Sequence, residues 1–157
     1  MTDERWLSRA VELATQNVAE GGGPFGALVV AADGTLLGEG TNRVTRDLDP
    51  SAHAEVTAIR AACAAIGDFS LAGATLFTSC EPCPMCLATA LWSRVDRVVF
   101  AADRHDAARG GFDDRAFYEM FDRDPATWEA PTVTAHRLPT SAAPFDAWLA
   151  AEDRTDY

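Results

Sequence analysis

The sequence predicts a layered α/β domain built on a mixed sheet of about five strands. Three observations support this prediction. The chain has 157 residues, which is the length of one domain. Its expected elements run in the order helix, hairpin, and then alternating helices and strands. Because no internal repeat, low-complexity tract or linker divides them, residues 1–157 are predicted to form a single domain.

The first five elements are expected at residues 3–20 (helix), 25–32 and 35–40 (strands), 50–66 (helix) and 75–79 (strand). Apolar residues at helical spacing predict the first helix, and three glycines before Pro24 end it. Asp33-Gly34 is a hairpin signal between the two strands. Ser51 is the expected N-cap of the second helix, which places His53 and Glu55 near its first turn. A short apolar run predicts the third strand.

The later elements are expected at residues 81–93 (helix), 97–102 (strand), 114–121 (helix), 132–138 (strand) and 144–152 (helix), with a polar loop at 103–113. Pro84 suits the first helical position, so Cys83 is the expected N-cap and Cys86 the third residue of that helix. The apolar run at residues 98–102 predicts a buried strand.

Composition narrows the classes of function. Hydrophobic residues are 48% and charged residues 24%, which argues against disorder. The net charge is −11 and all 13 basic residues are Arg, which weighs against binding to nucleic acid or to anionic lipid. No apolar run approaches the roughly 20 residues of a membrane span, and the N-terminus lacks a signal-peptide core. A cytoplasmic protein with a small neutral ligand is expected.

Two short segments carry chemistry, His53-Ala54-Glu55 and Pro82-Cys83-Pro84-Met85-Cys86. One imidazole and two thiolates make a three-ligand zinc set with a fourth position left open. The N-terminus of a helix also stabilises thiolates. Cys80 has the same spacing to Cys83, so it stays an alternative ligand, although its place at the end of a strand favours Cys83 and Cys86. Cys63 is interpreted as a small buried apolar residue.

Glu55 is the best candidate for a general base. Zinc with two thiolates acidifies water less than zinc with three histidines does, so a nearby carboxylate is needed. The alternative is a solvated carboxylate that the helix dipole favours, and the three-ligand set beside Glu55 argues against it.

His-x-Glu followed by Pro-Cys-x-x-Cys resembles the signature of the zinc-dependent cytidine deaminase superfamily. Longer segments resemble bacterial guanine deaminases, namely residues 23–27, 41–44, 49–60, 78–86, 111–114 and the closing Asp156-Tyr157. The resemblance implies a three-layer fold with a central mixed five-stranded sheet flanked by helices, and one zinc ion per subunit.

The resemblance also implies roles for particular residues. The metal ligands would be His53, Cys83 and Cys86, and the proton-transfer residues Glu55 and Asp114. The residues that bind the base would be Phe25, Asn42, Ala54, Trp92 and Tyr157. Three of these positions have simpler interpretations: Asn42 as a turn residue, Asp114 as a helix cap and Trp92 as part of the core.

The implied reaction is the hydrolytic deamination of a free nucleobase, guanine to xanthine and ammonia, and the partner is this small molecule. The resemblance further implies a homodimer in which a C-terminal segment of about residues 140–157 is exchanged. Tyr157 would then reach the active site of the neighbouring subunit.

Three other functions stay open. The substrate of the same chemistry could be cytosine, an ammeline-type triazine or a nucleoside. A tRNA adenosine deaminase shares the motifs, but residues 144–157 hold one Arg against four acids. A zinc-stapled structural module would need a fourth protein ligand such as Cys80.

Overall fold

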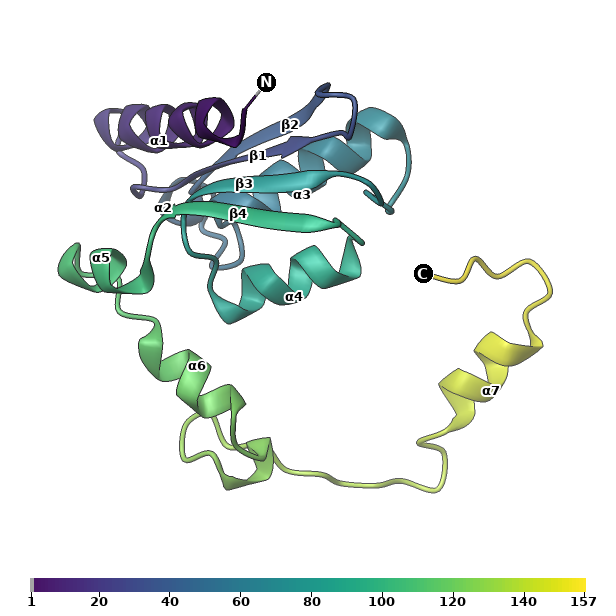
Figure 1. The fold of residues 1–157 in the computed structure, drawn as a ribbon. Coiled ribbons are helices and arrows are strands. Elements are labelled where there is room, and N and C mark those ends of the chain that lie inside the picture. The colour runs from purple at the N-terminus through teal and green to yellow at the C-terminus, as the bar shows by residue number, and fades with distance from the viewer. Residues whose placement is uncertain (1) are drawn as a thin grey trace. The chain divides into compact units, whose positions relative to one another are not determined.

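A four-stranded mixed sheet organises the first part of the chain in the computed structural model, which describes residues 2–157 (Figure 1). The strand order is β2-β1-β3-β4. β1 is antiparallel to both β2 and β3, and β3 is parallel to β4. The strands are β1 (Gly26–Val30), β2 (Leu36–Thr41), β3 (Thr75–Cys80) and β4 (Arg97–Ala102).

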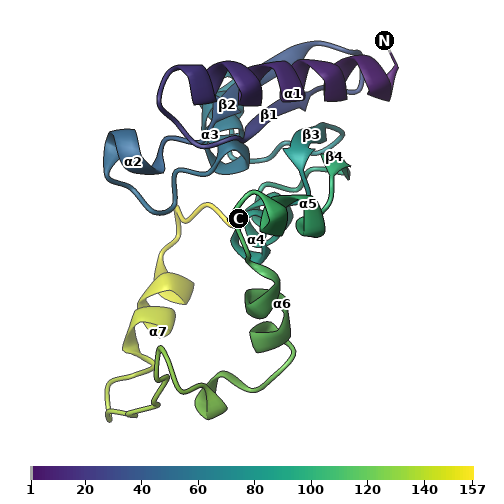
Figure 2. The ribbon, with the colours of Figure 1, turned by 90° about the vertical axis from the view of Figure 1, so that its left-hand side faces the viewer.

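Helices cover both faces of this sheet, which gives three layers (Figures 1 and 2). α1 (Asp3–Ala19) lies on one face, and α3 (Ala54–Ile66) and α4 (Pro84–Trp92) lie on the other. β1 alternates between the two cores. Leu28 and Val30 pack with α1, whereas Ala27 and Val29 pack with α3. The three-layer α/β fold that the sequence predicts is therefore confirmed.

Three short helices complete this part of the chain: α2 (Val44–Asp47), α5 (Arg104–Arg109) and α6 (Arg115–Phe121). The sequence predicted α6 but placed a polar loop where α5 lies, and it missed α2. α5 forms because Asp103 and Asp106 make a reciprocal capping box. No helix within residues 2–157 is long and apolar enough to cross a membrane.

The second helix begins later than predicted. Its N-cap is His53 rather than Ser51. The Asp49 carboxylate accepts hydrogen bonds from both the amide and the hydroxyl of Ser51, which holds Ser51 in a turn before the helix. Cys83, by contrast, is the N-cap of α4 with Pro84 at the first helical position, as the sequence predicted.

Two strand predictions are wrong in detail. The sheet has four strands, since residues 132–138 form none, and β4 is a half-covered edge strand rather than a buried one. Phe100 of β4 is 42% exposed. A segment becomes a strand only when it pairs with a neighbour, and residues 132–138 have no strand partner within the described chain.

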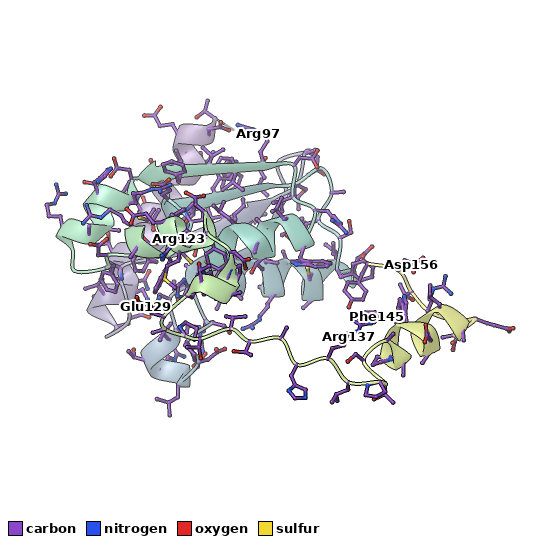
Figure 3. The ribbon with its side chains drawn as sticks, turned by 90° about the horizontal axis from the view of Figure 1, so that it is seen from below. Arg97, Arg123, Glu129, Arg137, Phe145 and Asp156 are labelled. Atoms are coloured by element: carbon purple, nitrogen blue, oxygen red, sulfur yellow. The ribbon has the colours of Figure 1, made fainter. Side chains whose placement is uncertain are left out.

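Residues 119–157 form a second compact unit, with a short 3₁₀ helix η1 (Pro125–Thr127) and α7 (Ala143–Ala150). Trp128 packs edge to face on Phe121, with the ring centroids 5.2 Å apart. None of the residues of this unit is buried. Phe145, labelled in Figure 3, belongs to α7 and is 70% exposed. This unit therefore buries too little apolar surface to be stable by itself.

Gly40 allows α3 to lie directly against β2. A methyl group at this position would meet the Ala54 carbonyl oxygen and the Ala58 amide nitrogen, both at 2.3 Å. Since both contacts are backbone atoms, they cannot rotate away. We expect Gly40→Ala to lower the free energy of unfolding by about 1–3 kcal/mol through overpacking. Chemical denaturation measures this change. Gly110→Ala, where the nearest atom would lie at 3.3 Å, is the control and should change stability much less.

Candidate metal centre

The N-termini of two helices bring three potential metal ligands together. His53 caps α3, Cys83 caps α4, and Cys86 lies in the first turn of α4. His53 Nδ1 is 3.5 Å from Cys83 Sγ and 3.5 Å from Cys86 Sγ. The two sulfur atoms are 3.6 Å apart. These are the three residues that the sequence predicted as ligands.

The triangle has the size of one face of a tetrahedral zinc site. Zinc bonds of about 2.3 Å to sulfur and 2.0–2.1 Å to nitrogen require separations of about 3.6 Å between nitrogen and sulfur and about 3.8 Å between sulfurs. The observed distances lie within a few tenths of an ångström of these values, so the residues fit the ion. Three protein ligands leave one tetrahedral position for a small molecule.

Cys80 does not belong to this group of atoms. Among the described residues, the ligand atoms that converge are those of His53, Cys83 and Cys86. The Cys80 thiol instead donates to the Asp103 carbonyl oxygen at 3.7 Å, and burial raises its pKa to about 11. A protonated, hydrogen-bonded thiol is a poor ligand, so the alternative of a zinc staple closed by Cys80 loses its support.

The Glu55 carboxylate lies beside the triangle and is buried, with 5% of its surface exposed. Its Oε2 is 3.4 Å from Cys86 Sγ, and its Oε1 accepts from the Thr78 hydroxyl at 3.3 Å. Burial raises the pKa of Glu55 above its ordinary value. Burial agrees with the rejection of a solvated carboxylate at this position. Thr78 is a contact that the sequence did not reveal, because it joins β3 to α3.

The two thiols differ in how readily they ionise. Hydrogen bonding with Cys86, together with His53 nearby, lowers the pKa of Cys83 to about 4. The same hydrogen bond, burial and the neighbouring Glu55 raise the pKa of Cys86. Both thiols must be ionised to hold a metal, so binding expels the remaining proton.

Asp114 directly precedes α6 and lies within electrostatic range of Cys83 and His53. Its Oδ1 is buried and, within residues 2–157, has no hydrogen-bond partner. Burial and the charge of the Cys83 thiolate raise the pKa of Asp114. An unpaired buried carboxyl oxygen costs free energy, which is typical of a group that is kept for its chemistry.

The loops that carry Phe25 and Asn42 are tied together by a residue that the sequence analysis missed. The buried Asn17 amide donates to the carbonyl oxygens of Gly23 at 2.8 Å and Asn42 at 2.9 Å. The Asn42 side-chain oxygen accepts from the Val44 amide at 3.3 Å, so its interpretation as a turn residue also holds.

Phe25 has a second aromatic neighbour. Its ring packs edge to face against Phe112, with the centroids 5.0 Å apart. Phe112 lies two residues before Asp114, so the aromatic pair links the Phe25 loop to the loop that carries Asp114.

Comparison with known proteins places this site in a family. Residues 1–102 match the model described as "Cytidine and deoxycytidylate deaminase zinc-binding region". The chain belongs to this zinc-binding deaminase family. Zinc is therefore its cofactor, and the triangle of His53, Cys83 and Cys86 is the group of described residues that fits it.

Similarity to individual deaminases extends further along the chain. Guanine deaminase of Bacillus subtilis is 45% identical over 162 residues, which cover all of both chains. Its crystal structure superposes with a TM-score of 0.95 at 44% identity, covering 100% of this chain and 99% of that one. A guanine deaminase structure from Nitrosomonas europaea has a TM-score of 0.66 at 37% identity, covering 69% and 63% of the two chains.

A tRNA-specific deaminase is similar over a shorter stretch. The tRNA-specific adenosine deaminase of Haemophilus influenzae is 40% identical over 100 residues, which are 64% of this chain and 58% of that protein. The chain is thus similar over its full length to a guanine deaminase and over about two thirds of its length to a tRNA-specific adenosine deaminase.

The remaining predicted residues are placed as follows. Ala54 is fully buried at the start of α3. Trp92 ends α4, about 12 Å along the helix axis from its first residue, and is 63% exposed. Tyr157 lies in the second unit, where its ring packs against Trp148, and is 72% exposed. The binding roles of these three residues in the deaminase stay predictions.

The zinc set can be tested with a pair of matched cysteine variants. Cys86→Ser replaces a thiolate within the triangle, so we expect it to lose at least about tenfold in zinc affinity. Cys80→Ser replaces a thiol outside it, and this variant should retain one zinc ion per chain. Competition with a chromophoric chelator measures both affinities. Loss of zinc from Cys80→Ser would show that the ligand set is misassigned.

Burial of Glu55 has a consequence for stability. Because its pKa is raised on folding, the folded protein binds this proton more tightly than the unfolded chain does, and stability falls as the pH rises through the raised pKa. Glu55→Gln removes this penalty. The metal-free variant should melt above the metal-free wild type at pH 8, by about 2–4 °C for each kcal/mol gained, and the difference should shrink towards pH 5.

Scanning calorimetry of metal-free protein at both pH values measures this effect. Glu12→Gln, at an exposed carboxylate of α1, is the control and should show no comparable gain. A metal-free Glu55→Gln protein that is less stable than the wild type at pH 8 would contradict this account of the site.

Proposed function

We propose that this protein is a zinc-dependent hydrolase that converts guanine and water to xanthine and ammonia. The observation that carries the hydrolytic chemistry is the three-ligand triangle with the buried Glu55 carboxylate 3.4 Å from Cys86 Sγ. The choice of guanine rests on the full-length similarity to the Bacillus subtilis guanine deaminase.

His53, Cys83 and Cys86 hold the metal in this proposal. A bound zinc ion supplies Lewis-acid chemistry that makes water nucleophilic near neutral pH. Cys83 lies at the N-terminus of α4, where backbone amides and the helix dipole favour its thiolate. The chain itself thus favours one ionised ligand, and Cys86 gives up its proton when metal binds.

Glu55 moves the first proton. Its carboxylate takes a proton from the attacking water, whose oxygen forms the new bond to C2 of the purine. Glu55 then gives that proton to the adjacent ring nitrogen. A carboxyl group whose pKa is raised by burial is suited to holding a proton between these two steps.

Asp114 assists the departure of the amino group. The bond between C2 and the exocyclic nitrogen breaks as that nitrogen gains the proton of the new C2 hydroxyl. The hydroxyl oxygen becomes the carbonyl oxygen of xanthine, and ammonia leaves. The buried Asp114 Oδ1, without a partner in the described chain, is free to bind the amino group. Asp114→Asn should therefore keep zinc and lose most of kcat.

The base itself is held by the loops around the metal site. We assign the Asn42 amide to hydrogen bonding with the purine, and the Phe25 ring to stacking on it, with Phe112 packed behind. Ala54 is fully buried and lets the flat base approach the start of α3. Trp92 and Tyr157 contribute further aromatic surface, with Tyr157 donated by a second subunit.

A tRNA substrate suits this chain poorly. The tRNA-specific relative matches 64% of the chain, against 100% for the guanine deaminase. The net charge of −11 repels a polyanion, whereas a neutral purine is unaffected.

The test is release of ammonia by the zinc-loaded protein from guanine, guanosine, adenine, cytosine and ammeline. We expect release from guanine alone. Glu55→Ala is the blank and should lower kcat by about 100-fold or more while it retains zinc. Release from another compound, with guanine inert, would overturn the assignment of guanine as the substrate but not the assignment of deaminase chemistry. Wild-type activity in Glu55→Ala would refute the proton-transfer role.

We further propose that two copies form a homodimer by exchanging their C-terminal segments, about residues 140–157, so that residues 1–157 complete one domain only in the pair. Support comes from the second unit, which buries none of its residues, and from the exposed edge strand β4. A truncated chain ending at residue 139 should sediment as a monomer, and the full chain as a dimer.

A reducing compartment such as the cytoplasm suits this enzyme. All four cysteines are free, and two of them must stay reduced to hold the metal.

A further inference from the structure

Asp114 needs an external support, because its own side chain does not hold it in place. Its Oδ1 has no hydrogen-bond partner within the described residues, and the residue stands in the loop between α5 and α6. A proton-transfer group must nevertheless be held to within about an ångström of its productive position. The supports must therefore come from the residues on either side of it in the chain.

The first support is Arg104, which begins α5. Its backbone amide and its Nε donate to Glu81 Oε2 at 2.9 and 3.0 Å, and its Nη2 donates to Oε1 at 2.5 Å. Such a forked pair fixes both direction and distance. Glu81 is mostly buried, with 17% of its side chain exposed, so the pair is shielded from solvent. Arg104 also holds the pKa of Glu81 below its ordinary value.

The second support is Tyr118, four residues after Asp114. Asp114 is the residue immediately before α6, and Tyr118 lies near the start of that helix. The guanidinium carbon of Arg104 lies 3.6 Å from the centroid of the Tyr118 ring. The Tyr118 hydroxyl donates to the Pro82 carbonyl oxygen. Burial raises the pKa of Tyr118, so the hydroxyl remains a donor at any working pH.

Both supports end on the same short segment. Glu81 and Pro82 are the two residues immediately before Cys83, so the contacts connect α5 and α6 directly to the segment that leads into the zinc triangle. We call Glu81, Arg104 and Tyr118, with the Pro82 carbonyl, the acid–arginine–tyrosine bridge. It connects the helices on either side of Asp114 to the segment that leads to Cys83.

We propose that Arg104 and Tyr118 are positioning residues that hold Asp114 at a fixed place relative to Cys83, and so align it with the leaving amino group. This inference rests on the role of Asp114 in the proposed function. Neither residue touches the substrate, and neither supplies a metal ligand. Their contribution is to fix the distance between Asp114 and the reacting atoms.

The test uses zinc-loaded Tyr118→Phe and Arg104→Gln, assayed for ammonia release from guanine. Tyr118→Phe keeps the ring and loses only the hydroxyl. We expect kcat to fall about 10- to 100-fold, with KM within about twofold and zinc at one ion per chain, because Phe25, Asn42 and the triangle are untouched. Arg109→Gln, an exposed arginine of α5 paired with Asp106, is the matched control and should retain wild-type kcat.

Two further readouts separate positioning from a general loss of structure. Hydrogen exchange in residues 110–118 should quicken in Tyr118→Phe, while exchange in residues 54–62 of α3 stays unchanged. In an Asp114→Asn background, Tyr118→Phe should not lower the residual kcat further, because the group that it positions is already gone.

The outcomes distinguish the two proposals. Wild-type kcat in Tyr118→Phe, or a loss that multiplies with that of Asp114→Asn, would overturn the positioning role alone. Loss of zinc in parallel with kcat would overturn it too, because the bridge would then support the metal rather than Asp114. Full activity of Asp114→Asn would overturn the role of Asp114 and the positioning role together.

Discussion

The site depends on two helices that begin at the same place. α3 starts after His53 and α4 starts after Cys83, and their first turns lie side by side with ligand atoms 3.5–3.6 Å apart. That proximity comes from the packing of the backbone rather than from the ligands. α3 lies directly on β2 because Gly40 has no side chain, and α4 starts where β3 ends. The packing of these backbones thus sets the spacing of the metal ligands.

This arrangement explains why so much polarity is buried at one point. A carboxylate, an imidazole and two thiols sit together at the edge of an apolar core, and burial raises the pKa of Glu55. Without a metal such a cluster is costly. A bound cation neutralises the thiolates, so metal binding stabilises the folded protein. In the proposed function, the same burial that destabilises the ionised Glu55 carboxylate suits it to carrying a proton during the reaction.

Sequence could predict the ligand set because local rules determine it. Pro84 makes Cys83 an N-cap, and that rule held. The start of α3 was misplaced because Asp49 engages the Ser51 hydroxyl, a contact that spacing does not reveal. The supports of the site were invisible for a different reason. Thr78 and Tyr118 reach their partners between separate elements, so their roles emerge only when the chain is folded.

The fifth strand could not be predicted correctly, because strand formation depends on a pairing partner that local sequence does not show. Residues 132–138 have the composition of a strand, but a strand needs a partner. Within residues 2–157, β4 pairs with β3 alone. In the dimer that we propose, the second subunit would supply what the single chain lacks.

X-ray absorption at the zinc edge tests the central claim most directly, because it counts the atoms around the metal. The triangle predicts two sulfur neighbours at about 2.3 Å and two nitrogen or oxygen neighbours at about 2.0–2.1 Å. The second light atom would come from outside the chain, and an added purine analogue should alter that shell alone. Three sulfur neighbours would contradict the account, because the fourth position would then belong to Cys80 and no room would remain for chemistry.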